Sequence, residues 1–267
     1  MILKKISWFF KRHPFLYIAR FKLLSKNSSI EDIQNYSYNR VNRKTDIPAY
    51  YKTVNSQIFE DCDFNSDLEL IKHLSRWLQN HIKGGRGLSE SSTEALKIML
   101  SGEGGVCSDM AQVFNNFCVL NNIEVREWGN TRAPFDKSYG GHSFNEVFVK
   151  ELNKWVLIDV SNGILFYNGK DEPLSVVELY QLNRKNHPIS YKSFNHEKET
   201  NKKNIKKNYL NPENVPFLIC NYSNKTYDYY LNRTPPRTPI FVVHFMLYLL
   251  GKSYHYRFPL DDYRKIF

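Results

Sequence analysis

A cysteine, a histidine and an aspartate follow one another in an order that suits thiol chemistry. Cys107 and His142 each follow a pair of glycines, and Asp159 lies further along the chain. An imidazole close to a thiol accepts its proton and later donates one to a leaving amine, while a carboxylate on the far ring nitrogen fixes the tautomer. Taken singly, the three have simpler interpretations as a core residue, a loop residue and a turn residue. Taken together, they predict a Cys-His-Asp triad.

The cysteine is expected at the first turn of a helix. From Cys107 to Cys118, apolar residues recur at the i, i+3, i+4 and i+7 spacing of one helix face. Gly104 and Gly105, separated from Cys107 by Val106, permit a close approach of the backbone. The N–H groups at a helix start carry partial positive charge, which favours thiolate over thiol. Cys118, about three turns along the same face, is predicted to be an inert core residue.

His142 and Asp159 are expected on two strands that pair. Residues 143–149 and 155–160 have the pattern of strands, and residues 151–153 between them are predicted to form a turn. In an antiparallel hairpin, the beginning of the first strand and the end of the second lie at the same end. A slip of one residue in register would separate the two side chains, so the sequence leaves their contact open.

The remaining elements are predicted from periodicity. Helices are expected over 67–82, 91–100 and 174–182, and strands over 123–129 and 165–170, with a loop over 130–141. Residues 27–60 and 191–207 are polar and are expected to be mostly irregular, the second as a solvated loop. The apolar segment 240–250 is shorter than the roughly 20 residues of a membrane span, so it is expected to pack on the core or to lie at a membrane surface.

Three motifs resemble those of a known family. They are G-V-C-S-D-M-A at 105–111, H-S-F-N-E-V at 142–147 and W-V-L-I-D at 155–159. Their order and spacing resemble the transglutaminase-like superfamily, papain-like thiol enzymes with the signature G-x-C, H-x-W-N-E-V and W-x-x-x-D. Phe144 stands where the family has tryptophan, and Val160-Ser161 stands where proline-threonine is common.

The resemblance covers residues 67–165 and implies a fold and a set of roles. The implied fold is α+β and papain-like, with the nucleophile helix packed on an antiparallel sheet. Cys107 would be the nucleophile, His142 the general base and acid, and Asp159 the orienting carboxylate. The implied reaction is acyl transfer or hydrolysis at an amide bond through a thioester, on a substrate that contains an amide or peptide. Protease, deamidase and transferase remain open.

The alternative is a non-catalytic module of the same fold that binds an anionic partner or a membrane surface. For the enzyme, the backbone N–H of Cys107 is the expected first oxyanion donor, and the second donor is not identified. Tyr139 and Trp128 are candidates for pocket walls. No cofactor and no metal are expected, because the four cysteines include no C-x-x-C pair and no Cys/His cluster with zinc spacing.

The composition bounds the compartment and the partners. Hydrophobic residues make up 42% of the chain and aromatic residues 15%, which excludes wholesale disorder. The formal net charge of +10 suits nucleic acid, an anionic membrane or an acidic glycan without choosing among them, and no specific nucleic-acid site is predicted. So few cysteines indicate free thiols in a reducing compartment, so a cytoplasmic location is expected.

Three regions are expected along the chain. Residues 1–60 form a basic aromatic extension, 61–190 the catalytic core, and 191–267 an extension packed on that core. Within 1–26, basic and aromatic residues are mixed, and the apolar run stops too early for a signal peptide. This segment is expected either to touch an anionic membrane peripherally or to cover the back of the core with its charges in solvent. The oligomeric state is open.

Overall fold

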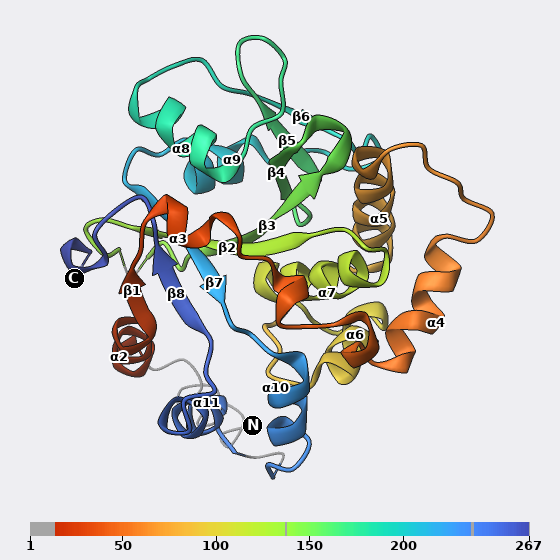
Figure 1. The fold of residues 1–267 in the computed structure, drawn as a ribbon, viewed down its shortest axis with the longest axis vertical. Helices are drawn as coiled ribbons and strands as arrows, with labels where there is room; N and C mark the ends of the chain where they lie inside the picture. Colours follow the sequence, from red (N-terminus) through yellow and green to blue (C-terminus); the bar gives the residue numbers. More distant parts are fainter. Residues whose placement is uncertain (1–13, 137, 236–237, 267) are drawn as a thin grey trace.

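A mixed β-sheet organises the chain. The computed structural model describes residues 14–136, 138–235 and 238–266. Its strands are β1 (Ser25–Asn27), β2 (Val125–Arg132), β3 (His142–Val149), β4 (Lys154–Asp159), β5 (Ile164–Tyr167), β6 (Ser190–Ser193), β7 (Asn214–Cys220) and β8 (His255–Phe258). Within the described residues they form one eight-stranded sheet in the order β1-β8-β7-β2-β3-β4-β5-β6 (Figure 1). All neighbours are antiparallel except β1 and β8.

Helices surround this sheet. They are α2 (Pro14–Leu24), α3 (Ile30–Gln34), α4 (Ala49–Ile58), α5 (Asp67–His81), α6 (Ser92–Leu100), α7 (Cys107–Leu120), α8 (Val176–Arg184), α9 (Lys202–Tyr209), α10 (Asn224–Leu231) and α11 (Ile240–Leu249), with short 3₁₀ turns at Tyr38–Arg40, Lys44–Asp46, Lys150–Leu152 and Tyr263–Lys265. One core lies between the sheet and α4 to α7, a second lies between the sheet, α8 and α9, and a third joins α2, α10 and α11 to β7 and β8. The α+β class expected from the sequence is confirmed.

Helix α7 is the central helix of the first core. Its apolar residues Met110, Phe114 and Phe117 are buried against β2, β3 and the neighbouring helices, and Cys118 is fully buried, as predicted. Burying each phenylalanine ring stabilises the fold by about 1.5–3 kcal/mol. Asn122, with a φ of 58°, turns the chain into the left-handed region directly after the helix, which ends it. The helix is therefore fixed along its length, and its first turn is held with it.

The predicted helices and hairpin are confirmed, with small differences at their ends. One strand is longer than expected: β2 continues to Arg132, where the sequence predicts a loop from residue 130. The reason is pairing with β7, which is distant in sequence, since Thr131 lies opposite Val215 and Arg132 opposite Asn214. Hydrogen bonds to a distant strand extend β2 beyond what the local pattern indicates.

Two segments predicted to be irregular are ordered. Between residues 27 and 60, α4 buries Tyr51, Val54 and Ile58 on one face. Between 191 and 207, β6 ends and α9 begins. Helix α9 is mostly lysine and asparagine, but Ile205 and Tyr209, four residues apart, are both buried. In each case a few apolar residues at helical spacing outweigh a polar composition.

Helix α2 packs with elements from the C-terminal part of the chain. Phe21 and Leu24 of α2 are buried with residues of β7, β8 and α11, so this part of the predicted N-terminal segment covers the core. Residues 1–13 of that segment lie outside the described residues. No helix in the described part of the chain is long and apolar enough to cross a membrane. The division into three regions stays a prediction.

Candidate active site

The start of α7 is set by a close approach of two backbone segments. Gly85 N–H donates to the Gly105 carbonyl, and Gly105 N–H donates to the Arg86 carbonyl, both at 2.8 Å. Gly105 has a φ of +107°, and a Cβ there would lie 2.9 Å from Met99 Cγ. Neither the backbone conformation nor the space admits a side chain. The close backbone approach predicted from the glycines is confirmed, and Cys107 lies at the first position of the helix.

Asp109 secures the same turn. Its carboxylate accepts the N–H of Val106 at 2.9 Å and the N–H of Leu88 at 3.1 Å. The first bond pairs a backbone donor at the helix start, and the second ties the preceding loop to it. The sequence analysis did not assign this role, although an acid at the third position of a helix is its usual signal.

The hairpin brings His142 and Asp159 together. Asn145 lies opposite Ile158, and continuing this register puts Phe144 opposite Asp159. His142, two residues before Phe144, lies on the same face of the sheet. Its Nε2 lies 2.8 Å from Asp159 Oδ2. The contact that the sequence left open is therefore made.

Asp159 is completely buried and amply hydrogen-bonded. Besides the His142 ring, Tyr209 Oη donates to Oδ2 at 2.7 Å, Asn162 Nδ2 donates to Oδ2 at 2.6 Å, and Asn162 N–H donates to Oδ1 at 3.0 Å. Burial alone would raise the pKa of this carboxyl, but the charge of His142 and these donors hold it below the ordinary value. Asp159 is therefore present as a carboxylate.

Cys107 and His142 form the other half of the arrangement. Burial opposes the thiolate, yet the hydrogen bond and charge of His142 and the backbone N–H of Ser143 bring the pKa of the Cys107 thiol below its ordinary value. Burial likewise opposes the imidazolium, but Asp159 and Cys107 raise the pKa of His142. Because Nε2 faces Asp159, Nδ1 is the ring nitrogen left for the thiol. The lowered pKa of the thiol and the raised pKa of the imidazole favour a thiolate–imidazolium pair, with Cys107 partly exposed.

Tyr209 is a fourth member that the sequence analysis missed. It comes from the end of α9, and burial, followed by the charge of Asp159, raises the pKa of its hydroxyl far above the ordinary value, so it acts as a neutral donor. Its ring meets His142 edge to face, with ring centroids 5.7 Å apart, and it packs against Phe144 in the same way. The only sequence signal was its spacing from Ile205 in a segment of lysine and asparagine.

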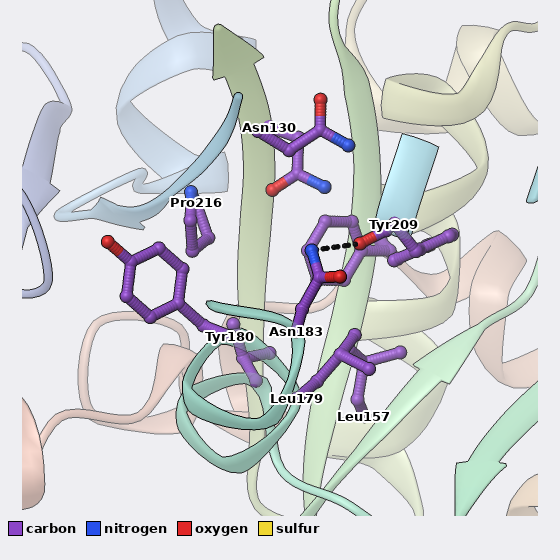
Figure 2. A pocket seen from close by; sticks show the side chains of 10 residues that line it. Asn130, Leu157, Leu179, Tyr180, Asn183, Tyr209 and Pro216 are labelled. Carbon is purple, nitrogen blue, oxygen red and sulfur yellow. Dashed lines mark hydrogen bonds between the residues drawn. The ribbon is translucent and has the colours of Figure 1, made fainter. Parts of the chain in front are cut away.

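A small pocket adjoins Tyr209 on the second core. Figure 2 shows Tyr180 and Asn183 of α8 lining it beside Tyr209, and Asn183 Nδ2 donates to the Tyr209 carbonyl at 3.2 Å. Its cavity volume of about 20 Å³ has room for about one water molecule. The pocket is therefore too small for a peptide substrate. Its walls instead hold Tyr209 in place from the side of α8.

A second buried carboxyl, Glu127, lies under the start of α7. Burial, followed by the charges of Cys107 and Asp109, raises its pKa to about 8. Asn115 Nδ2 donates to Oε2 at 3.2 Å, while Oε1 has no partner. Asn145 lies directly opposite on β3, and its Oδ1 is also buried without a partner. A buried carboxyl with so few donors around it is better accommodated as the neutral acid, which agrees with its raised pKa.

The two candidate wall residues differ in position. Trp128 is completely buried in the second core, where its Nε1 donates to Glu146 Oε2 at 2.9 Å. Tyr139 is buried beneath Arg132, whose guanidinium lies 4.4 Å from the ring centroid. Burial raises the pKa of Tyr139, and the charges of Cys107 and Asp159 act in the same direction, so this ring lies near the triad. Within the described residues, no group of three His, Cys, Asp or Glu could hold a metal ion.

A family model matches the central part of the chain. Residues 52–160 match the family model of the transglutaminase-like superfamily. These residues form a transglutaminase-like core. The match covers less than half of the chain, contains Cys107, His142 and Asp159, and excludes Tyr209. The resemblance found in the motifs is thereby confirmed, together with the papain-like fold that it implies.

Similarity beyond this core is slight. No curated protein matches the chain. One solved structure, from Cytophaga hutchinsonii and bearing the name "putative cysteine protease", shares 17% identity over 42% of this chain and 37% of its own, with a TM-score of 0.33. The chain thus spans well under half of that protein, and the overlap is too low to support an argument about activity.

Proposed function

We propose that this protein is a cysteine enzyme that cleaves or transfers an acyl group at an amide bond through a thioester on Cys107. The observation that carries the proposal is the hydrogen-bonded series from Cys107 through His142 to the buried Asp159. Members of the transglutaminase-like superfamily are typically cysteine-dependent enzymes. A module that only binds a partner has no need for a thiol, an imidazole and a buried carboxylate in this order.

In the proposed reaction, the Cys107 thiolate attacks the amide carbonyl carbon. The C–N bond then breaks as the His142 imidazolium donates its proton to the departing amine. Neutral His142 next accepts a proton from a water molecule or an acceptor amine, which attacks the thioester and releases Cys107 as thiolate. Asp159 stabilises the imidazolium throughout and keeps Nδ1 directed at the sulfur.

Two features of the core support the formation of the thiolate. Cys107 lies at the start of the 14-residue helix α7, where the partial charge of the helix dipole is positive. Backbone N–H groups at the start of a helix are also suited to stabilise a tetrahedral oxyanion. Glu127, when protonated, adds no negative charge close to the sulfur. These features agree with the direction of the Cys107 pKa.

The experiment is acylation by p-nitrophenyl acetate, followed by mass spectrometry of the intact protein and peptide mapping. We expect a burst of p-nitrophenolate and an acetyl group on Cys107 that hydroxylamine removes, as befits a thioester. His142→Ala should greatly slow both steps, and Cys62→Ala, which changes an exposed thiol, should leave them unchanged. Acetylation of Cys107 that is equally fast in His142→Ala would refute the proposed role of the imidazole.

A further inference from the structure

The positive charge of this protein is concentrated in two segments. Residues 1–30 contain seven lysines and arginines, and residues 229–260 contain four, with no aspartate or glutamate in either. The rest of the chain therefore holds 26 basic and 27 acidic residues. The two segments carry a formal charge of +11, and everything else carries −1. The net charge of +10 is thus contributed by two segments of the sequence.

The two segments lie together in space. Strand β1 pairs in parallel with β8, and Figure 1 shows α2 beside α11. Phe21 of α2 is buried in the same core as Val243 and Leu247 of α11. Burial and the charge of Arg20 lower the pKa of His244 to about 3, which also places α2 close to α11. The described parts of the two acid-free segments therefore lie together on one side of the molecule.

Apolar side chains are exposed on this same side. Along α11 and its C-terminal end, Phe245 is 54% exposed, Leu249 69% and Leu250 51%. Val242, also in α11, and Leu23, in α2, are exposed as well. A helix that covers a core normally has a polar outer face, whereas α11 from Ile240 to Leu249 contains no aspartate, glutamate, lysine or arginine. Exposed apolar groups clustered in this way mark an interaction surface.

We propose that this α2–α11 face, made by Leu23, Val242, Phe245, Leu249 and Leu250 with the exposed lysines Lys22, Lys26 and Lys252, binds an anionic lipid surface. The apolar side chains enter the acyl-chain boundary while the lysines contact lipid phosphates. A second copy of the chain would bring lysines against lysines, which disfavours self-association through this face.

The test is co-sedimentation of the full chain with vesicles, under conditions in which the protein remains folded. We expect binding to vesicles of phosphatidylcholine mixed with phosphatidylglycerol, weak binding to phosphatidylcholine alone, and loss of the difference as salt is raised. Equal binding to both vesicles, or binding that salt leaves unchanged, would overturn the electrostatic part of the proposal.

Matched variants locate the surface. Phe245→Ser should weaken binding about tenfold, because its side chain no longer leaves water, whereas Leu152→Ser, at an exposed leucine in the turn between β3 and β4, should not. Lys252→Ala should weaken binding about fivefold, whereas Lys170→Ala, at an exposed lysine outside the two segments, should not. Equal effects in the members of either pair would overturn the proposal.

A second copy of the chain is the remaining occupant to exclude. Analytical ultracentrifugation without lipid compares the wild-type protein with Phe245→Ser. We expect no dimer of the wild-type protein that the substitution dissociates. Such a dimer, in a protein that does not bind vesicles, would assign the face to self-association and overturn the lipid proposal. The rate of Cys107 alkylation should be unchanged in all these variants, which separates this proposal from the catalytic one.

Discussion

Replacing Glu127 by glutamine should stabilise the protein at neutral pH. Glu127 is buried between α7 and the sheet, with Asn115 as its one hydrogen-bond partner, and burial raises its pKa from 4.5 to about 8. The unfolded chain loses the proton near pH 4.5, whereas the folded chain keeps it until about pH 8. Between these values the folded state binds more protons, so stability falls as pH rises.

The size of the effect follows from the two pKa values. Each pH unit between them costs about 1.4 kcal/mol, so Glu127 destabilises the fold by about 3 kcal/mol at pH 7 and by about 5 kcal/mol above pH 8. Glutamine cannot ionise, and its side chain has nearly the same size and shape as the protonated acid. We therefore expect Glu127→Gln to gain about 3 kcal/mol at pH 7 and nothing at pH 4.

Urea unfolding at pH 4, 7 and 8.5 measures this difference. Glu146→Gln is the matched control, because Glu146 is also buried but accepts hydrogen bonds from Arg126 and Trp128. Removing its charge leaves the Arg126 guanidinium buried without a counterion, so we expect a loss of about 3–5 kcal/mol. A loss of stability in Glu127→Gln at pH 7, or a gain that does not grow with pH, would refute the reasoning.

Two further substitutions test the supports of the triad. Tyr209→Phe removes a hydrogen bond to a buried carboxylate and should reduce the free energy of unfolding by about 1.5–3 kcal/mol at pH 7. This difference should shrink as pH falls through the lowered pKa of Asp159, and a difference constant with pH would contradict the assigned contact. Asp109→Ala leaves the N–H groups of Val106 and Leu88 without this acceptor. We expect urea unfolding to show a free energy of unfolding lower by about 1–2 kcal/mol. We also expect mass spectrometry to show slower alkylation of Cys107. Unchanged alkylation would show that the cap does not position the thiol.

The triad could be predicted because its parts lie in elements that local sequence specifies. Cys107 begins a helix with a regular apolar face, and His142 and Asp159 belong to one hairpin with a short turn. Glycines before Cys107 mark a close backbone approach that the structure shows at Gly105. The register of the hairpin was not predictable, because it depends on which side chains the two cores bury.

The parts that were missed depend on contacts between distant segments. Strand β7 inserts between β2 and β8, so the end of β2 is determined by residues more than 80 positions later. Tyr209 reaches Asp159 from a lysine-rich helix whose polar composition indicates solvent. Glutamate is usually a surface residue, and Glu127 is buried because it lies on β2 beneath α7, opposite Asn145. Such features follow from tertiary packing, which outweighs local composition.

The rate of Cys107 alkylation by iodoacetamide as a function of pH tests the central proposal most directly. The wild-type protein should react with a midpoint below the pKa of an ordinary thiol, about 8.5, because His142 and the Ser143 N–H stabilise the thiolate. In His142→Ala the burial of Cys107 remains without this compensation, so the midpoint should rise above the ordinary value. Cys107→Ala identifies the labelled peptide. A wild-type midpoint at or above about 8.5, unchanged in His142→Ala, would contradict the assignment of Cys107 as an activated nucleophile.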